Sequence, residues 1–391
     1  MDRPPSTIST HLTNLTILGL LAVVLLFLGL GSMGLTDRDE GRNAEAGREM
    51  LETGNYVSPT FNYEPRFAKP ALVYWLMSIS YRWFGVDEFS ARLPSAVFGL
   101  GLIMVQYLFV SRFFGPVVGL LGALMLLLNV QIIGLSRMVL TDSVLIFFTT
   151  LSLFAFWLGW AGRDEERWWR WVFYFSMGIA TLAKGPVGFL IPLVTVAIYL
   201  TATGQWHRFW RDASPLAGSL LFAAVALPWY AAMWSLHGSQ YTASARADTV
   251  GRFLNPMEGH GFTVLFYLPV LLVGFFPWSG WLPFAWYEAY RSWREARRGG
   301  TNETPRSDRS ADELSWFAAA WVLGTLVFFT LSSTRLAHYI APLFPAAALL
   351  TATYWHRSLV DPQLKGRRAS IHTMMAIGYL LAIGFASLPS L

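Results

Sequence analysis

The sequence contains no cysteine and few charged residues. Without cysteine, this chain of 391 residues can form no disulfide, no thiolate metal site and no cysteine nucleophile. Only 14% of the residues are charged, whereas about 25% is usual in soluble domains. Hydrophobic residues make up 54% and aromatic residues 16%, with 18 Trp and 29 Phe. This composition excludes intrinsic disorder and indicates an all-α, polytopic membrane protein.

Eleven segments are apolar and close to the roughly 20 residues that a transmembrane helix needs. The first has an apolar stretch from Leu15 to Leu35 that is too long for a signal peptide, and no small-residue cleavage site follows it, so we expect a retained anchor. The predicted spans are 12–35, 93–111, 116–135, 143–161, 168–183, 185–203, 214–234, 262–287, 314–331, 336–355 and 371–391.

The net charge of +5 reports on orientation. Most Lys and Arg fall in short connections on one side, which predicts a cytoplasmic N-terminus in a bacterial inner membrane. Segments 36–92 and 235–261 are then two long outer loops, and connections of this length are usually functional. The Arg-, Gly- and Ser-rich segment 288–313 is typical of a solvated cytoplasmic linker. No nucleotide-binding glycine motif stands in a convincing context, and the basic charge is explained by topology, so no nucleic-acid partner is expected.

The first outer loop is predicted to hold two helices at the membrane surface. One runs from Asp39 to Leu51 and stops at Gly54. The other covers 71–85, which is aromatic but too short to span. Asp39 alone would most often be a helix N-cap, and Lys69 alone an interfacial lysine with its ammonium in the headgroups.

An ordered string of motifs changes this interpretation. Segment 39–50 reads DEGRNAEAGREM and is followed by Gly54-Asn55-Tyr56, Lys69-Pro70 and the RLPS of 92–95. Further motifs are LTDS (140–143), LAKG (182–185), GRFLNP (251–256), GFFPW (274–278) and STRLAHYIAPLFPAAAL (333–349). Over nearly its whole length the chain resembles the GT-C glycosyltransferases that use polyprenyl-phosphate sugars, the aminoarabinose transferase and protein O-mannosyltransferase group.

The resemblance implies a single GT-C transmembrane domain over 1–391 that moves a sugar, with inversion, from a polyprenyl phosphate to an acceptor hydroxyl on the outer face. Deprotonation of the acceptor needs a base, and Asp39 matches the position that the family uses. The leaving lipid phosphate needs cations or donors, for which we expect Lys69, Arg252, Lys184 and Tyr339. Asp142 is placed in the site without the base role, although it could simply cap its helix. The supporting residues expected are Glu40, Arg42 and Glu45.

Two departures from the family pattern bear on the function. Ala68 stands where aminoarabinose transferases usually have a Glu beside a metal site, so the sequence does not decide whether a divalent metal binds there. A metal at the outer His237, His260 or His338 is equally undecided. The chain ends in or just after its eleventh span, so no C-terminal soluble domain is expected in it.

The sequence leaves alternatives both for the acceptor and for the class of protein. A lipid A-like lipid or another glycan is favoured as acceptor, and a protein Ser or Thr is the alternative. A lipid or solute transporter or flippase is the rival from another class. Transporters place ionisable residues near mid-membrane, whereas most spans here carry charge only at their ends.

Overall fold

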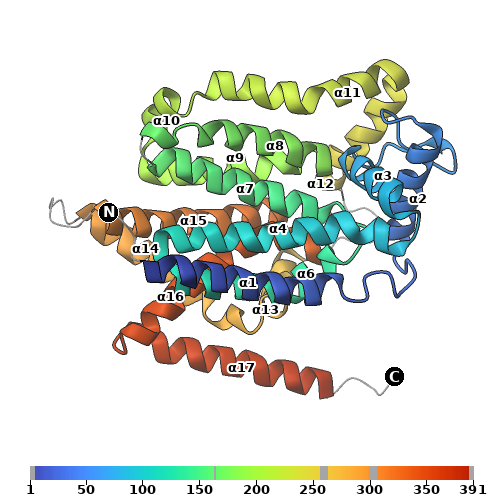
Figure 1. Cartoon of the computed structure of the whole chain (residues 1–391). Helices are drawn as coiled ribbons and strands as arrows, with labels where there is room; N and C mark the ends of the chain where they lie inside the picture. Colours follow the sequence, from blue (N-terminus) through green and yellow to red (C-terminus); the bar gives the residue numbers. More distant parts are fainter. Residues whose placement is uncertain (1–4, 163, 256–262, 299–305, 387–391) are drawn as a thin grey trace.

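The protein is a bundle of long helices with a cluster of short elements at one end (Figure 1). The computed structural model describes residues 5–162, 164–255, 263–298 and 306–386. Parts of the predicted segments 235–261, 288–313 and 371–391, and with them His260, lie outside the described residues.

Long helices account for the bundle and its periphery, and most run along the same direction in Figure 1. They are α1 (Pro5–Phe27), α4 (Glu88–Phe114), α7 (Asp142–Ala161), α8 (Trp169–Lys184), α9 (Val187–Thr203), α11 (Pro215–Arg246), α14 (Leu282–Arg298), α15 (Arg306–Leu331), α16 (Phe344–Val360) and α17 (Arg367–Ala386). Shorter elements join them: α5 (Pro116–Leu127), α6 (Val130–Ser136), η1 (Asp164–Glu166), α10 (Trp206–Asp212), η3 (Val264–Phe266), α13 (Tyr267–Gly274), η4 (Trp278–Gly280) and η5 (Ala337–Leu343).

Within the part of the chain that the structure describes, five single helices are long and apolar enough to cross a membrane: Ile8–Phe27, Glu88–Phe114, Asp142–Ala161, Pro215–Leu254 and Ala311–Leu331. Two bent pairs raise this to seven if each pair is one span. The described part of each of the eleven predicted segments overlaps a helix or a helix pair, and their number as spans stays a prediction. The first helix ends at Phe27, earlier than the predicted 12–35.

Two of the predicted spans are not continuous helices. Segment 116–135 bends by 66° between α5 and α6, and segment 262–287 bends by 120° between η3–α13 and η4–α14. Apolar periodicity cannot distinguish a straight helix from a broken one, because both are apolar along their length. The Asn129 amide supports both breaks: its oxygen accepts from Ile132 N, and its nitrogen donates to Gly274 O at 2.7 Å.

The second outer loop, 235–261, and the predicted cytoplasmic linker, 288–313, are also more helical than expected. The second outer loop continues α11 through a break at Gly238 (φ 51°), then forms the π-helical turn η2 (Ala247–Gly251) and α12 (Arg252–Leu254). Within 288–313, α14 extends to Arg298 and α15 begins at Arg306. A polar composition favours a loop in both segments, but Ala, Glu and Arg also favour helix, and the helix prevails here.

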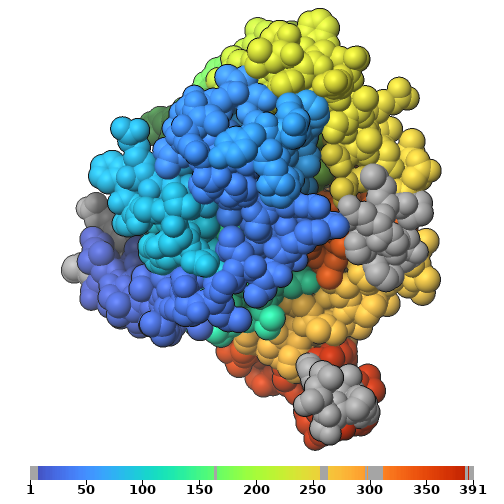
Figure 2. Space-filling view, turned by 90° about the vertical axis from the view of Figure 1, so that its right-hand side faces the viewer, coloured from blue at the N-terminus to red at the C-terminus, as the bar shows by residue number. Residues whose placement is uncertain are grey.

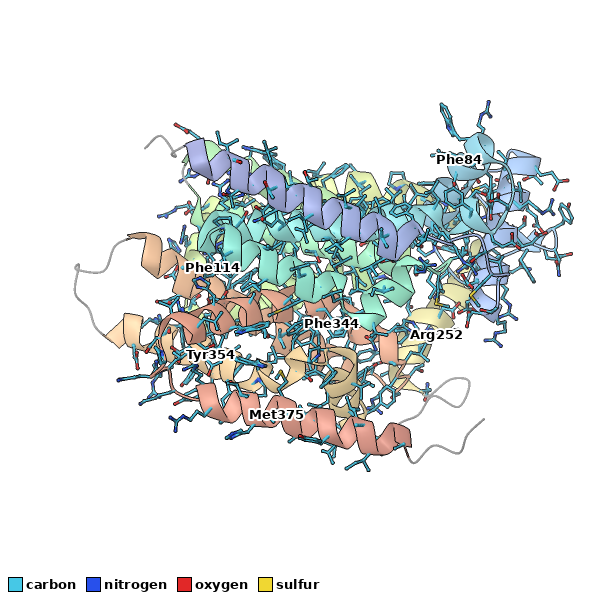
Figure 3. All side chains as sticks on the ribbon, turned by 60° about the horizontal axis from the view of Figure 1, so that its bottom comes forward. Phe84, Phe114, Arg252, Phe344, Tyr354 and Met375 are labelled. Carbon is cyan, nitrogen blue, oxygen red and sulfur yellow. The ribbon has the colours of Figure 1, made fainter. Side chains whose placement is uncertain are left out.

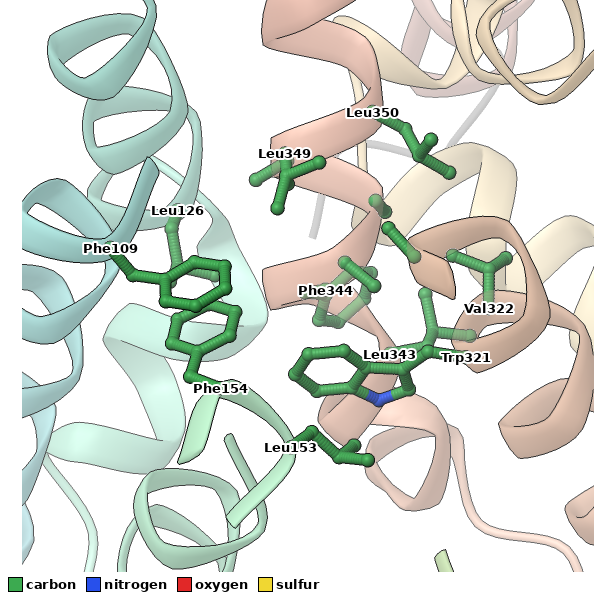
Figure 4. Close-up of a cluster of buried hydrophobic side chains, with 14 of the residues drawn as sticks. Phe109, Leu126, Leu153, Phe154, Trp321, Val322, Leu343, Phe344, Leu349 and Leu350 are labelled. Atoms are coloured by element: carbon green, nitrogen blue, oxygen red, sulfur yellow. The ribbon is translucent and has the colours of Figure 1, made fainter. Parts of the chain in front are cut away.

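Aromatic packing fills the core of the bundle. Phe109 of α4 stacks on Phe154 of α7 with ring centres 3.7 Å apart, and Phe154 meets Trp321 of α15 edge-on (Figure 4). Many Leu, Ile and Val side chains on α1, α11 and α17 are exposed, among them Leu20, Leu216 and Leu380. Exposed apolar faces on several helices suit contact with lipid.

The first outer loop folds as predicted into two helices, α2 (Arg38–Thr53) and α3 (Leu72–Phe84), with a hairpin of β1 (Thr60–Phe61) and β2 (Glu64–Pro65) between them. Gly54 ends α2 in the left-handed conformation (φ 69°), as expected. The N-cap, however, is Asp37, whose side chain accepts from Asp39 N at 2.8 Å. The N-cap interpretation of Asp39 is therefore wrong, and its carboxylate is not occupied in capping.

Candidate functional site

Three segments meet at the end of the bundle that carries α2 and α3. The first is the stretch 66–70 between the hairpin and α3. Arg66 ties it down, since its guanidinium donates to Asn43 Oδ1 of α2 and to Tyr74 Oη of α3, each at 3.2 Å. This anchoring sets the position of Lys69, which is half-buried.

The second segment joins the start of α7 to the end of α8. Asp142 is buried and accepts from Lys184 Nζ at 2.6 Å. Thr141, not Asp142, occupies the N-cap position, so the alternative of Asp142 as a helix cap is wrong. The residues before it are held by α2: Glu40 accepts from Val139 N at 2.9 Å, and Asn43 donates to Val139 O at 2.9 Å.

The third segment is the turn η2–α12 together with residues 332–336, which follow α15. Arg252 Nε donates to Asp248 Oδ1 at 3.0 Å. Backbone bonds join the two stretches, because Thr334 N donates to Arg252 O and Ser333 N to Phe253 O. On the next turn, the Tyr339 ring lies 5.0 Å from Lys184 Nζ, and His338 Nε2 is 4.0 Å from Asp142 Oδ1.

These segments surround a cavity of about 420 Å³, a size usual for ligand sites. Its lining includes five of the predicted residues, Lys69, Asp142, Lys184, Arg252 and Tyr339. Most of the remaining wall is apolar, from Leu145, Val187, Leu190, Trp229, Phe253, Phe328 and Phe329.

The cavity belongs to one end of the molecule. Figure 2 looks onto this end, where the blue first loop and the yellow end of α11 flank a depression in which orange-red residues are visible. Arg252 lies at the same end as Phe84 of α3, and Phe114 and Tyr354 lie toward the other (Figure 3).

Lys69 is the cation of this cavity that is available to a ligand. Its ammonium makes no hydrogen bond or ion pair with any other described residue. Burial lowers the pKa of Lys69 to about 8, and the positive charges of Lys184 and Arg252 contribute in the same direction. A partly desolvated ammonium without a partner is a strong site for an anion.

The residues predicted on α2 lie outside the cavity lining. Asp39 is half-buried, and its negative charge acts against the lowering of the Lys69 pKa. Glu40 forms a buried ion pair with Arg92 at 3.1 Å. Glu45 pairs with Arg48 of its own helix at 2.7 Å. Arg42 is half-buried and makes no hydrogen bond or ion pair within the part of the chain that the structure describes.

Two residues of the site did not follow from the sequence in these roles. Asp248 precedes Arg252 by four positions, and this spacing would have indicated the pair had the loop been recognised as helical. The sequence suggests His338 only as a metal ligand, because its approach to Asp142 depends on tertiary packing. Among the described residues, no group of three or more His, Asp and Glu is arranged to hold a metal ion.

Comparison with known proteins places the chain in a family. Residues 17–242 match the model of the dolichyl-phosphate-mannose-protein mannosyltransferase family, which is more than half of the chain. The chain belongs to this family.

Relatives of this family member include arabinosyl transferases. The undecaprenyl phosphate-alpha-4-amino-4-deoxy-L-arabinose arabinosyl transferase of Pseudomonas aeruginosa is 31% identical over 327 residues, which are 82% of this chain and 56% of that protein. A protein of Aquifex aeolicus is 29% identical over 87% of this chain and 73% of its own length. The chain thus spans little more than half of the arabinosyl transferases it matches.

Solved structures agree on the fold. ArnT from Cupriavidus metallidurans bound to undecaprenyl phosphate matches with a TM-score of 0.80 and 26% identity, over 95% of this chain and 64% of that one. The archaeal oligosaccharyltransferase AglB from Archaeoglobus fulgidus matches with a TM-score of 0.60 at 14% identity, over 94% and 55%, and supports the fold alone. The expected GT-C fold of a multi-pass membrane protein is confirmed.

Proposed function

We propose that this chain is an integral-membrane glycosyltransferase that moves a sugar from a polyprenyl phosphate to an acceptor hydroxyl. The observation that carries this is the cavity itself, in which the unpaired ammonium of Lys69 and two further cations stand against an apolar wall. Such a cavity suits a ligand with an anionic head and an apolar tail. The ArnT structure bound to undecaprenyl phosphate and the named arabinosyl transferases support the same ligand class.

The transfer breaks the bond between the anomeric carbon and a phosphate oxygen, and the phosphate leaves with the electron pair. Lys69, Lys184 and Arg252 stabilise the charge that develops on this oxygen. Asp142 keeps Lys184 beside the cavity through their 2.6 Å contact. The ring of Tyr339 lies against the same ammonium.

The acceptor hydroxyl attacks the anomeric carbon and gives its proton to Asp39, the proposed general base. The Asp37 cap supports this role, because it leaves the Asp39 carboxylate without a capping bond. The negative charge of Asp39 acts to raise the pKa of Lys69, and this influence on a lining residue supports a role for Asp39 near the cavity.

The acceptor proposed is a lipid A-like lipid or another glycan, and a protein hydroxyl is the alternative that the family name supports. The proposed location is a bacterial inner membrane, with the N-terminus in the cytoplasm and the cavity facing outward. The short basic connections support this orientation.

The test uses purified protein, radiolabelled polyprenyl-phosphate sugars and a membrane extract as source of acceptor. Asp39→Asn is expected to lower the transfer rate about 100-fold, which is the usual contribution of a general base. Asp37→Asn is the matched control, because Asn caps helices as well as Asp and removes the same charge two residues away. Undiminished transfer by Asp39→Asn excludes it as the base, and no transfer by the wild type with any donor favours the transporter alternative.

A further inference from the structure

The charges around the cavity are unequal in sign. Both acidic residues of the described lining are already in ion pairs, Asp142 with Lys184 at 2.6 Å and Asp248 with Arg252 at 3.0 Å. Lys69 is a third cation, and no acid of the described residues pairs with it. The described lining therefore holds no carboxylate that is available to a positively charged group on a ligand.

Position 68 strengthens this imbalance. Ala68 lines the cavity directly before Lys69, so a methyl group occupies a place from which a longer acidic side chain could reach a ligand. His338, beside Asp142, contributes no negative charge at any pH. Asp39 does not line the cavity, and under the proposed function its carboxylate accepts a hydrogen bond from the acceptor hydroxyl, which occupies it when the sugar is transferred.

The arabinosyl transferases that this chain resembles are named for a 4-amino-4-deoxy sugar, whose amine is protonated at neutral pH. Within the described lining, that ammonium would meet the charge of Lys69 and no acid outside an ion pair, which is costly where solvent is excluded. A donor with a neutral sugar carries only the negative charge of its phosphodiester, and the ammonium of Lys69 can balance that charge.

We propose that this chain selects a donor whose sugar bears no free amino group, either a neutral hexose or an N-acylated amino sugar. The inference rests on the proposed function, since it concerns the sugar carried by the same polyprenyl phosphate. It separates this chain in donor specificity from relatives that share its fold.

The experiment measures binding of four ligands to the full chain in detergent. Undecaprenyl phosphate reports on the phosphate site alone. The 4-amino-4-deoxy-L-arabinose donor and its N-formyl derivative differ mainly in one positive charge, and a mannose donor supplies a neutral sugar of another shape. The two neutral donors are expected to bind at least about tenfold more tightly than the amino donor, because an unpaired charge is removed.

Two variants at position 68 test the cause. Ala68→Glu adds an acid to the cavity wall and is expected to raise affinity for the amino donor about tenfold relative to the N-formyl donor. Ala68→Gln has the same size without the charge, and should leave the ratio of the two affinities as in the wild type.

The outcomes separate the two proposals. Equal or tighter binding of the amino donor by the wild type overturns the specificity inference and leaves the glycosyltransferase proposal standing. Failure of undecaprenyl phosphate and of every donor to bind overturns both. If Ala68→Gln raises the affinity for the amino donor as much as Ala68→Glu does, the size of the side chain and not its charge governs the site. That result contradicts the inference.

Discussion

Lys69 shows how a residue gains its role from its surroundings. In the sequence it is one of 29 basic residues, and only the motif string distinguishes it. In the fold, Arg66 fixes its loop to α2 and α3, while Asp142 and Asp248 already have cationic partners. Among the described residues of the lining, Lys69 is therefore the cation without an acidic partner, and an incoming phosphate can neutralise it.

The lowered pKa of Lys69 makes donor binding depend on pH. The Lys69 side chain is fully charged well below its pKa of about 8, and its positive charge is lost as the pH rises through that value. Affinity for undecaprenyl phosphate should therefore fall between pH 8 and 10, by up to about tenfold per pH unit. Lys69→Arg keeps a charge that does not titrate in this range and should bind with little pH dependence, as measured by ligand titration.

A parallel control is Lys69→Met, which removes the charge at every pH. It should bind weakly at pH 7.5 and show a flat profile. If wild type and Lys69→Arg lose affinity equally above pH 8, another group governs the pH response.

The helix α2 contributes to the site mainly by holding other elements. Glu40 is buried against Arg92, whose guanidinium also donates to the carbonyl oxygens of Leu30, Met33 and Gly34. The same carboxylate accepts from Val139 N, two residues before Thr141. The Glu40–Arg92 pair thus joins α2 to the stretch 30–34 that follows α1 and to the residues that precede Asp142.

Removal of this carboxylate charge should weaken the fold. Glu40→Gln leaves the buried Arg92 without its counter-ion and is expected to lower the free energy of unfolding by about 3 kcal/mol. The measurement is thermal unfolding in detergent followed by Trp fluorescence. Glu52→Gln is the matched control, since Glu52 pairs with Arg48 on an exposed surface and should change stability by less than about 0.5 kcal/mol. Equal effects of the two variants would contradict the structural role of Glu40.

Among the elements, α2 and α3 could be predicted because local signals define them: turn residues, a C-terminal glycine and a short aromatic run. The breaks at α5–α6 and α13–α14 could not, because apolar residues flank them on both sides and Gly274, to which Asn129 donates across the two breaks, is distant from it in sequence. The helical course of 235–254 was missed for the opposite reason, since polar residues obscured it.

The arrangement of the whole molecule predicts which ends are accessible from each side of the membrane. The natural absence of cysteine allows single cysteines to be introduced without background. Glu52→Cys, on α2, should react with an impermeant maleimide in intact cells whose outer membrane has been made permeable. Glu295→Cys, on α14, should react only after the inner membrane is opened. The reverse pattern would overturn the proposed orientation, and with it the outward-facing cavity.

Composition and motif order alone determined the membrane class, the family resemblance, the two helices of the first outer loop and five polar residues of the cavity lining. Each of these depends on local chemistry: apolar length, capping and the order of a few side chains along the chain. The three-dimensional fold decided which of those residues share a cavity and which pairs neutralise one another. Asp142 and Lys184 are 42 positions apart, and the meeting of Arg252 with the stretch after α15 crosses a still longer interval. Such contacts depend on how helices pack, and packing is settled by the shapes of many distant side chains together.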